Sequence, residues 1–187
     1  MGKLKGVNVL SLGIASALFL SFTGSAGATA LNTPKIKQEG KQWCWVASSQ
    51  MILQFFGKTS VSQCSLYKTG KGTTTCDDYP GTDSQAQKAM YENGVSTYRY
   101  TSALSFDDLA AQVFSSSQPV YIHWDWGNGT GHAVVAKYTE TNNNTQYVSY
   151  NDPGEGTSHT MSYTSFKGGS GYDRTWVSGL KDAYKYK

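Results

Sequence analysis

The chain has 187 residues, with 16 Lys and Arg against 13 Asp and Glu, which gives a formal net charge of +3. This length suffices for one domain with a single core, or at most for two small domains. Charged residues make up only 16% of the chain, whereas Tyr and Gly occur 13 and 20 times. Such a composition argues against both a disordered chain and a nucleic-acid-binding protein.

The N-terminal region has the three parts of a secretory signal peptide. Residues 1–5 are basic, residues 7–22 are apolar and small, and residues 25–30 contain two A-x-A sites. A membrane anchor is the competing interpretation, but polar residues interrupt the apolar run and no basic stop-transfer flank follows it. We therefore expect residues 1–30 to be removed, leaving a secreted, extracellular domain over residues 31–187 without stable membrane association.

Secretion affects the interpretation of the three cysteines, because thiols pair in an oxidising compartment and an odd one remains. Cys64 and Cys76 flank a flexible stretch of mostly Ser, Thr, Gly and Lys, which a disulfide closes with little strain. We expect these two residues to form the pair. Cys44 is then left over, and a leftover cysteine is often only a small buried hydrophobic residue.

The sequence around Cys44 favours a reactive thiol instead. Over residues 44–56 the apolar side chains recur at three- and four-residue steps, and Gly57 follows as a stop, which predicts a helix of about three turns. Cys44 lies in its first turn. The unpaired N–H groups and the positive dipole end of a helix stabilise a thiolate at that position.

The remaining elements fall into a helical part and a sheet part. Residues 58–82 show little periodicity, and short helices are predicted over 83–93 and 105–115. After Pro119, aromatic and β-branched segments separated by Gly and Asn turns predict strands over 120–126, 132–140, 145–152 and 172–177. Helices first and an antiparallel sheet second indicate an α+β domain in two layers.

The strands on either side of loop 141–144 should form a hairpin. Pairing the two residues that flank this loop places His132 opposite Pro153, with a register error of one residue in either direction. His132 is therefore expected beside Asn151 and Asp152 at the open end of the hairpin. The register error leaves open which of these two shares a face with His132.

A cysteine at a helix start, an imidazole at a strand start and a carboxylate or amide on the partner strand are the parts of a cysteine hydrolase. The thiolate attacks a carbonyl carbon, the imidazole protonates the leaving amine, and the third group orients the ring. An oxyanion donor is also needed, and Gln38 lies close enough before Cys44 to supply its amide. One such donor contributes about 2.7–4 kcal/mol to the transition state.

These motifs resemble those of bacterial papain-like cysteine proteases, in particular secreted effector-type proteases and relatives of bacteriocin-leader peptidases. The similar runs are residues 38–45, 61–64, 131–135 and 150–153. The resemblance implies a papain-like fold with a cleft between a helical half and a sheet half, and a peptidase that works through a thioester acyl-enzyme without cofactor or metal.

The resemblance also implies individual roles: Cys44 as nucleophile, His132 as general base and acid, Asp152 as orienting acid and Gln38 as oxyanion donor. Plant-type papains carry Asn as the third member, so Asn151 remains the alternative to Asp152. The short stretch 31–37 is too small for the long inhibitory propeptide of many papain relatives. The expected partners are a protein or peptide substrate and a proteinaceous inhibitor.

Three other functions compete with this one. A cell-wall amidase or a deamidase would use the same triad. A zinc module would need closely spaced ligands, whereas the nearest potential pairs, Cys64 with Cys76 and His123 with His132, are widely separated. A non-catalytic secreted binding or toxin domain would use the tyrosine-rich surface, but that role does not require the full set of candidate residues.

Segment 120–126 adds one histidine and two tryptophans. His123 is interpreted as a half-buried strand residue in preference to a second base or a ligand. Trp124 and Trp126 belong either to the core or to the wall of a substrate cleft, and the sequence leaves this choice open.

Overall fold

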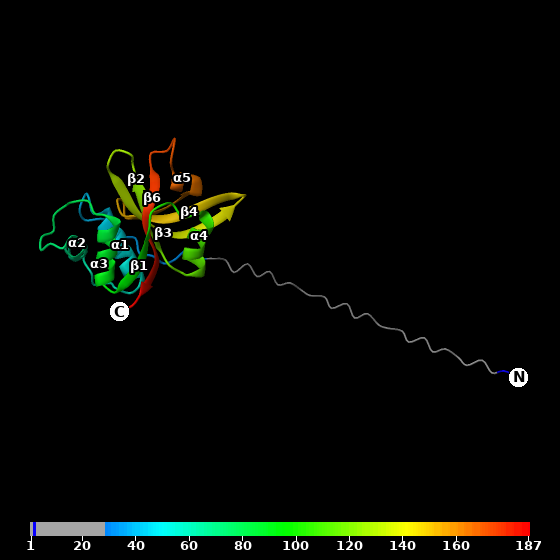
Figure 1. Ribbon diagram of the computed structural model, residues 1–187, viewed down its shortest axis with the longest axis horizontal. Helices are drawn as coiled ribbons and strands as arrows, with labels where there is room; N and C mark the ends of the chain where they lie inside the picture. The colour runs from blue at the N-terminus through cyan, green and yellow to red at the C-terminus, as the bar shows by residue number, and fades with distance from the viewer. Residues whose placement is uncertain (1, 3–28) are drawn as a thin grey trace.

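The computed structural model describes Gly2 and residues 29–187. The signal peptide predicted over residues 1–30 lies almost wholly outside these described residues. None of the helices in the described part has the length and apolar character needed to span a bilayer. Helices lie on both faces of a six-stranded sheet, with α1, α2 and α3 together on one side and α4 and α5 on the other (Figure 1).

All strand pairs of the sheet are antiparallel, in the order β1-β6-β2-β3-β4-β5. The strands are β1 (Val95–Tyr100), β2 (Val120–Asp125), β3 (Gly131–Asn142), β4 (Thr145–Asp152), β5 (Thr157–Ser162) and β6 (Thr175–Lys185). The predictions for β2, β3 and β4 are confirmed. The last strand starts later than predicted and is longer, and the edge strands β1 and β5 are additional. Because β1 precedes α4, the order is not strictly helices first.

The helices include the three that were predicted. They are α1 (Cys44–Phe55), α2 (Gln63–Lys71), α3 (Asp83–Glu92), α4 (Phe106–Ala110) and α5 (Tyr163–Lys167), and a π-helical turn over Ala111–Ser115 continues α4. Helix α2 was not predicted, because Leu66 and Tyr67 are the only large apolar side chains that it buries. The side chain of Ser62 caps its N-terminus by accepting the N–H of Ser65.

Alternation along the central strands divides the core between the two faces of the sheet. On β3, Ala133 and Val135 pack with α1, α2 and α3, whereas Val134 and Ala136 pack with Phe166 of α5 on the other face. The α+β prediction is confirmed, and β3 lies between the two halves of the core.

The β3–β4 hairpin has a tighter turn than predicted. Residues 143–144 alone form the loop, and both are Asn with positive φ, 48° and 62°, a conformation that Asn tolerates. The register then shifts between Ala136 and Tyr138. Extending the shifted register places His132 opposite Gly154, one residue from the predicted partner Pro153. The two residues are close, since a Cβ on Gly154 would lie 3.7 Å from the imidazole.

Candidate active site

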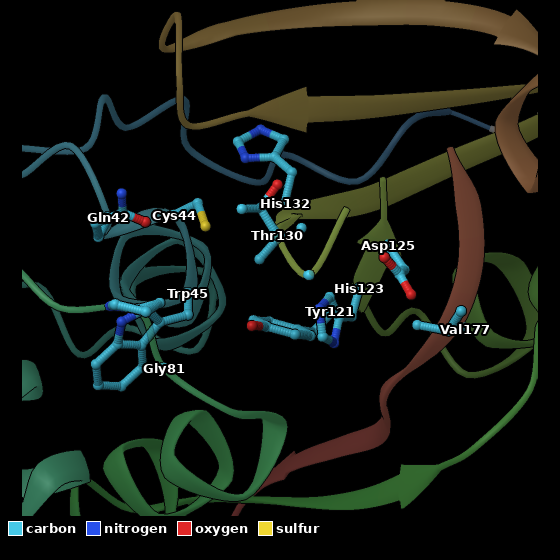
Figure 2. A pocket seen from close by; sticks show the side chains of 14 residues that line it. Gln42, Cys44, Trp45, Gly81, Tyr121, His123, Asp125, Thr130, His132 and Val177 are labelled. Atoms are coloured by element: carbon cyan, nitrogen blue, oxygen red, sulfur yellow. The ribbon is translucent and has the colours of Figure 1, made fainter. Parts of the chain in front are cut away.

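Cys44 is the first residue of α1 and the one free cysteine of the described residues. Trp43 occupies the N-cap position without making a side-chain capping hydrogen bond. The N–H groups of the first turn therefore have no intrahelical partner, and the helix dipole favours a negative charge at this end. Figure 2 shows the sulfur of Cys44 directed into a cavity, on the side where His132 lies.

The hairpin brings His132 and Asp152 together. Side-chain alternation places His132 on the face of Val134 and Asp152 on the face of Tyr150, and both of these neighbours belong to the same core cluster. Nε2 of His132 lies 2.7 Å from Oδ1 of Asp152. Because an ionised carboxylate only accepts hydrogen bonds, Nε2 carries a proton and Nδ1 is left for the side of the ring toward Cys44.

The electrostatics favour an ionised pair. Burial lowers the pKa of His132, but hydrogen bonds and charges from Asp152 and Cys44 outweigh it and raise the pKa to about 9. Burial raises the pKa of Asp152, yet its contacts with His132 and the N–H of Gly154, 2.8 Å from Oδ1, hold this pKa below its ordinary value. Near neutral pH the imidazolium and the carboxylate therefore coexist.

Asn151 is directed away from His132. It is fully buried, and its Nδ2 donates to the carbonyl oxygens of Thr33 at 2.9 Å and Pro34 at 3.1 Å. This amide fastens the N-terminal segment to β4. Of the two neighbours that the sequence left open, Asp152 is the one that contacts His132.

Gln38 adopts a different arrangement from the one expected. Its Nε2 donates to the carbonyl oxygens of Gly40 and Lys41, both at 2.8 Å, and its buried Oε1 has no hydrogen-bond partner among the described residues. Its backbone N–H donates to Pro153, just beyond Asp152, at 2.8 Å. The residue thus lies near the candidate triad, but both of its amide protons are used within its own turn.

A cavity of about 340 Å³ contains Cys44 and His132 in its wall. Trp126 stacks on the outer side of the His132 ring, with centroids 5.7 Å apart and planes inclined by 22°, and it is 46% exposed. Trp124 is buried and donates to the carbonyl oxygen of Phe166 at 2.9 Å. Trp124 therefore belongs to the core, whereas Trp126 shields the imidazole and is not among the residues that line the cavity.

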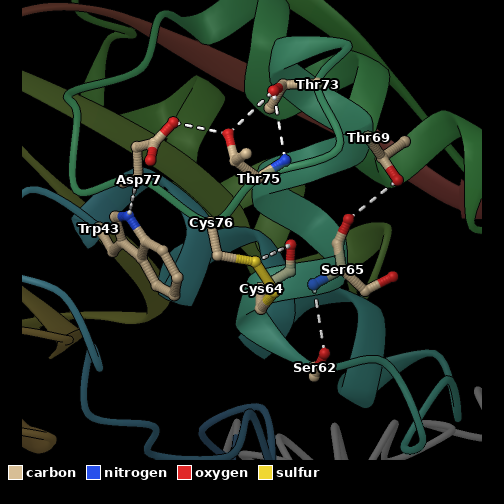
Figure 3. The surroundings of a disulfide bond; sticks show 9 residues. All are labelled: Trp43, Ser62, Cys64, Ser65, Thr69, Thr73, Thr75, Cys76 and Asp77. Atoms are coloured by element: carbon tan, nitrogen blue, oxygen red, sulfur yellow. Dashed lines mark hydrogen bonds between the residues drawn. A yellow bond between two sulfur atoms is a disulfide. The ribbon is translucent and has the colours of Figure 1, made fainter.

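The predicted Cys64–Cys76 disulfide is present, with Cα atoms 5.5 Å apart. The chain has only three cysteines that could serve as zinc ligands, and the disulfide occupies two of them. Figure 3 shows the chain after Cys76 returning toward Trp43, the residue before Cys44, where Nε1 of Trp43 donates to the carbonyl oxygen of Asp77 at 3.0 Å. The disulfide therefore anchors a loop that borders the cysteine.

Asp78 in this loop holds the turn before Cys44. Its carboxylate accepts the N–H of Lys41 at 2.9 Å and the N–H of Gln42 at 2.8 Å, and Gln42 lines the cavity. The sequence alone does not reveal this contact, because the partners of Asp78 are backbone groups 37 and 36 residues away. An acidic residue in a polar loop carries no signal of such a contact.

Comparisons with known proteins identify a family and a fold for the chain. A family model described as papain-like cysteine protease AvrRpt2 matches residues 28–169. The search of curated proteins found no significant match.

Two solved structures are similar in fold. One is a double glycine motif protease from an AMS/PCAT transporter in complex with the leader peptide, with a TM-score of 0.59 and 20% identity over 82% of this chain and 92% of the other. The second is the peptidase domain of Streptococcus ComA, a bifunctional ABC transporter, with a TM-score of 0.61 and 16% identity over 79% and 96% of the two chains.

These matches confirm the papain-like fold and the prediction of a cysteine-type peptidase. The solved structures support the fold alone at their low identity, whereas the family model covers most of the chain and both strands of the hairpin. The chain belongs to the family of the papain-like cysteine protease AvrRpt2.

Proposed function

We propose that this peptidase is secreted and cleaves peptide bonds with Cys44 as nucleophile, His132 as general base and acid, and Asp152 as the residue that orients the imidazole. The observation that carries the proposal is the 2.7 Å contact of Asp152 with His132, a residue that lines the same cavity as Cys44. This contact leaves Nδ1 of the imidazole for the thiol.

The reaction proceeds in two acyl transfers. The thiolate of Cys44 attacks the carbonyl carbon, and His132 donates its Nδ1 proton to the leaving amine as the thioester forms. Water then attacks the thioester, His132 removes a proton from that water, and the carboxylic acid leaves as the thiolate of Cys44 and the imidazolium of His132 are regenerated. Asp152 stays ionised throughout and stabilises the imidazolium.

The oxyanion needs donors at the start of α1. The backbone N–H of Cys44, in the first helical turn, is one. The amide of Gln38 becomes the second by exchanging the carbonyl oxygen of Lys41 for the oxyanion. This exchange should cost little free energy, because the hydrogen bond to Lys41 that it breaks is exposed to water. Rotation of the amide breaks no hydrogen bond to Oε1 of Gln38, since that atom has no partner among the described residues.

The substrate we propose is a protein or peptide chain. One protease of similar fold is described in complex with a leader peptide. Gly81 and Gly131 line the cavity beside Cys44 and pack closely against Trp45 and His123, so this part of the wall is backbone that an extended substrate chain can approach.

Secretion is proposed on two grounds. The first 30 residues carry the charge and size pattern of a signal peptide, and the Cys64–Cys76 disulfide is typical of an oxidising compartment. N-terminal sequencing of the protein recovered from the medium of an expressing culture tests the boundary, and the expected first residue lies near Leu31. Retention of residues 1–30 on the recovered chain would contradict this part of the proposal.

The triad is tested with Cys44→Ala and His132→Ala proteins on casein and on a peptide library. Both variants should lose turnover while keeping the circular dichroism spectrum and thermal stability of the parent. Asp107→Asn, a change in an exposed acid on α4, serves as the matched control and should keep full activity. If the Cys44→Ala protein hydrolyses these substrates as fast as the parent, the assignment is wrong.

A further inference from the structure

The cavity extends from Cys44 to a second group of polar side chains on β2. Alternation along this strand turns Tyr121, His123 and Asp125 toward the same face, and all three line the cavity. Figure 2 shows Cys44 at one end of the cavity, with His123 and Asp125 at the other. The peptidase mechanism uses neither of these two residues.

His123 is held in one orientation from behind. Its Nδ1 lies 3.1 Å from Oδ1 of Asp83 and 3.3 Å from Oγ of Ser178. The hydroxyl of Ser178 already donates to Oδ2 of Asp83 at 2.5 Å, so the proton between the imidazole and these two oxygens belongs to Nδ1. In the neutral ring, Nε2 is then a hydrogen-bond acceptor.

The free nitrogen of His123 faces the cavity wall. A Cβ placed on Gly131 would lie 2.9 Å from Nε2, and Gly131 lines the cavity next to His132. Gly131 therefore packs directly against Nε2 with no side chain between them, and the side chain of His123 is 33% exposed.

Asp125 provides a negative charge at the same end. Its Oδ1 accepts the N–H of Gly127 at 2.7 Å, which occupies one oxygen of the carboxylate and fixes its direction. Among the described residues that line the cavity there is no Lys or Arg. This end therefore presents one acceptor nitrogen and one carboxylate, and no Lys or Arg of the cavity wall pairs with them.

We propose that His123 and Asp125 form a subsite for a basic side chain of the peptide substrate. Lys and Arg carry only donors and a positive charge, which matches an acceptor nitrogen and an uncompensated carboxylate. Asp125 supplies the charge and His123 accepts one hydrogen bond, while Asp83 and Ser178 hold the imidazole as positioning residues. The inference rests on the proposed function and adds the class of residue that the peptidase selects.

A proteome-derived peptide library tests this inference. Mass spectrometry of the cleavage products identifies the residues on both sides of the scissile bond. The parent protein should enrich Lys and Arg at one position. Asp125→Asn should lower kcat/KM for such peptides about 10- to 100-fold, relative to matched peptides carrying norleucine or Gln. His123→Phe should lower it in the same direction, through KM more than kcat, and Asp125→Lys should shift the preference to Asp and Glu.

Asp107→Asn is the matched control and should keep the preference of the parent, and equal melting temperatures confirm that the variants are folded. Cleavage of the library without basic enrichment, or enrichment that survives both Asp125 substitutions, would overturn the subsite and leave the proposed function intact. Failure of the parent protein to cleave any peptide would overturn both.

Discussion

The side chain of Ser48 donates a hydrogen bond to the carbonyl oxygen of Ala133 at 3.0 Å, in a buried contact between α1 and β3. Ser48 lies one turn after Cys44 in the helix, and Ala133 follows His132 in the strand. The two elements that carry the proposed nucleophile and base are thus tied together beside those residues. This bond fixes the helix against the strand and, with them, the distance between sulfur and imidazole.

Removing this bond should weaken both the fold and catalysis. Ser48→Ala leaves a buried carbonyl oxygen with fewer partners, which costs about 1–3 kcal/mol of unfolding free energy. It also loosens α1 against β3, so kcat should fall about tenfold or more. Urea denaturation and steady-state kinetics measure the two effects.

Ser49→Ala is the matched control. Ser49 is equally buried, but its hydroxyl donates at 2.7 Å to the carbonyl oxygen of Trp45 within the same helix. This substitution should lower stability without a comparable loss of kcat. Equal losses of kcat in the two variants would mean that the contact with Ala133 has no positioning role.

The pH dependence of activity should follow His132. Its imidazolium form is present below a pKa of about 9 and is lost above it, so kcat/KM should fall as pH rises through about 9. The folded-state pKa of His132 lies above the ordinary value of about 6.5. The stability that the ion pair contributes is therefore fully present below about pH 6.5 and is lost as the pH rises through about 9.

Asp152→Asn should move this alkaline limb to lower pH. The substitution removes the negative charge that favours the imidazolium, so the pKa of His132 falls. Glu155→Gln is the control, because Glu155 is an exposed neighbour that contacts His159 and not His132. NMR titration of the His132 ring and the pH profile of kcat/KM should shift together in the first variant alone, and an unshifted limb in Asp152→Asn would contradict the pairing.

Gln38→Ala tests the oxyanion donor. Loss of its amide should lower kcat by about 10²–10³ with little change in KM, because the bond forms only in the transition state. Gln42→Ala is the comparison, since Gln42 also lines the cavity at this end. A large effect in Gln42→Ala and a small one in Gln38→Ala would transfer the role to Gln42.

The Cys64–Cys76 disulfide should contribute stability to the fold. The Cys64→Ser, Cys76→Ser double variant should lose about 2–4 kcal/mol of unfolding free energy, measured by urea denaturation under mild reductant that keeps Cys44 reduced. The loop that follows carries Asp78, so Asp78→Asn with the disulfide intact separates the loss of the loop anchor from the loss of the covalent link. An unchanged denaturation midpoint in the double variant would show that the link contributes nothing.

The sequence predicted the buried elements best. Helix α1 and strands β2, β3 and β4 bury apolar side chains at regular steps, and this periodicity is readable without a structure. Strands β1 and β5 are edges with several exposed positions, and α2 buries few large apolar residues. Their formation depends on partners that are distant in the chain, so local pattern does not reveal them.

The same division holds for the candidate site. Motif order and helix position were enough to single out Cys44 and His132. The choice between Asn151 and Asp152 depends on the turn and the bulge of one hairpin, which shift the register by single residues. Contacts such as that of Asp78 with backbone N–H groups form only in the folded chain.

The pairing of Cys44 with His132 is tested most directly by the rate at which a peptidyl vinyl sulfone labels the protein, followed by intact mass and peptide mapping. The parent should be labelled at Cys44 alone, at least about 100-fold faster than the His132→Ala protein. Equal labelling rates in the two proteins, or modification at another residue, would contradict the pairing.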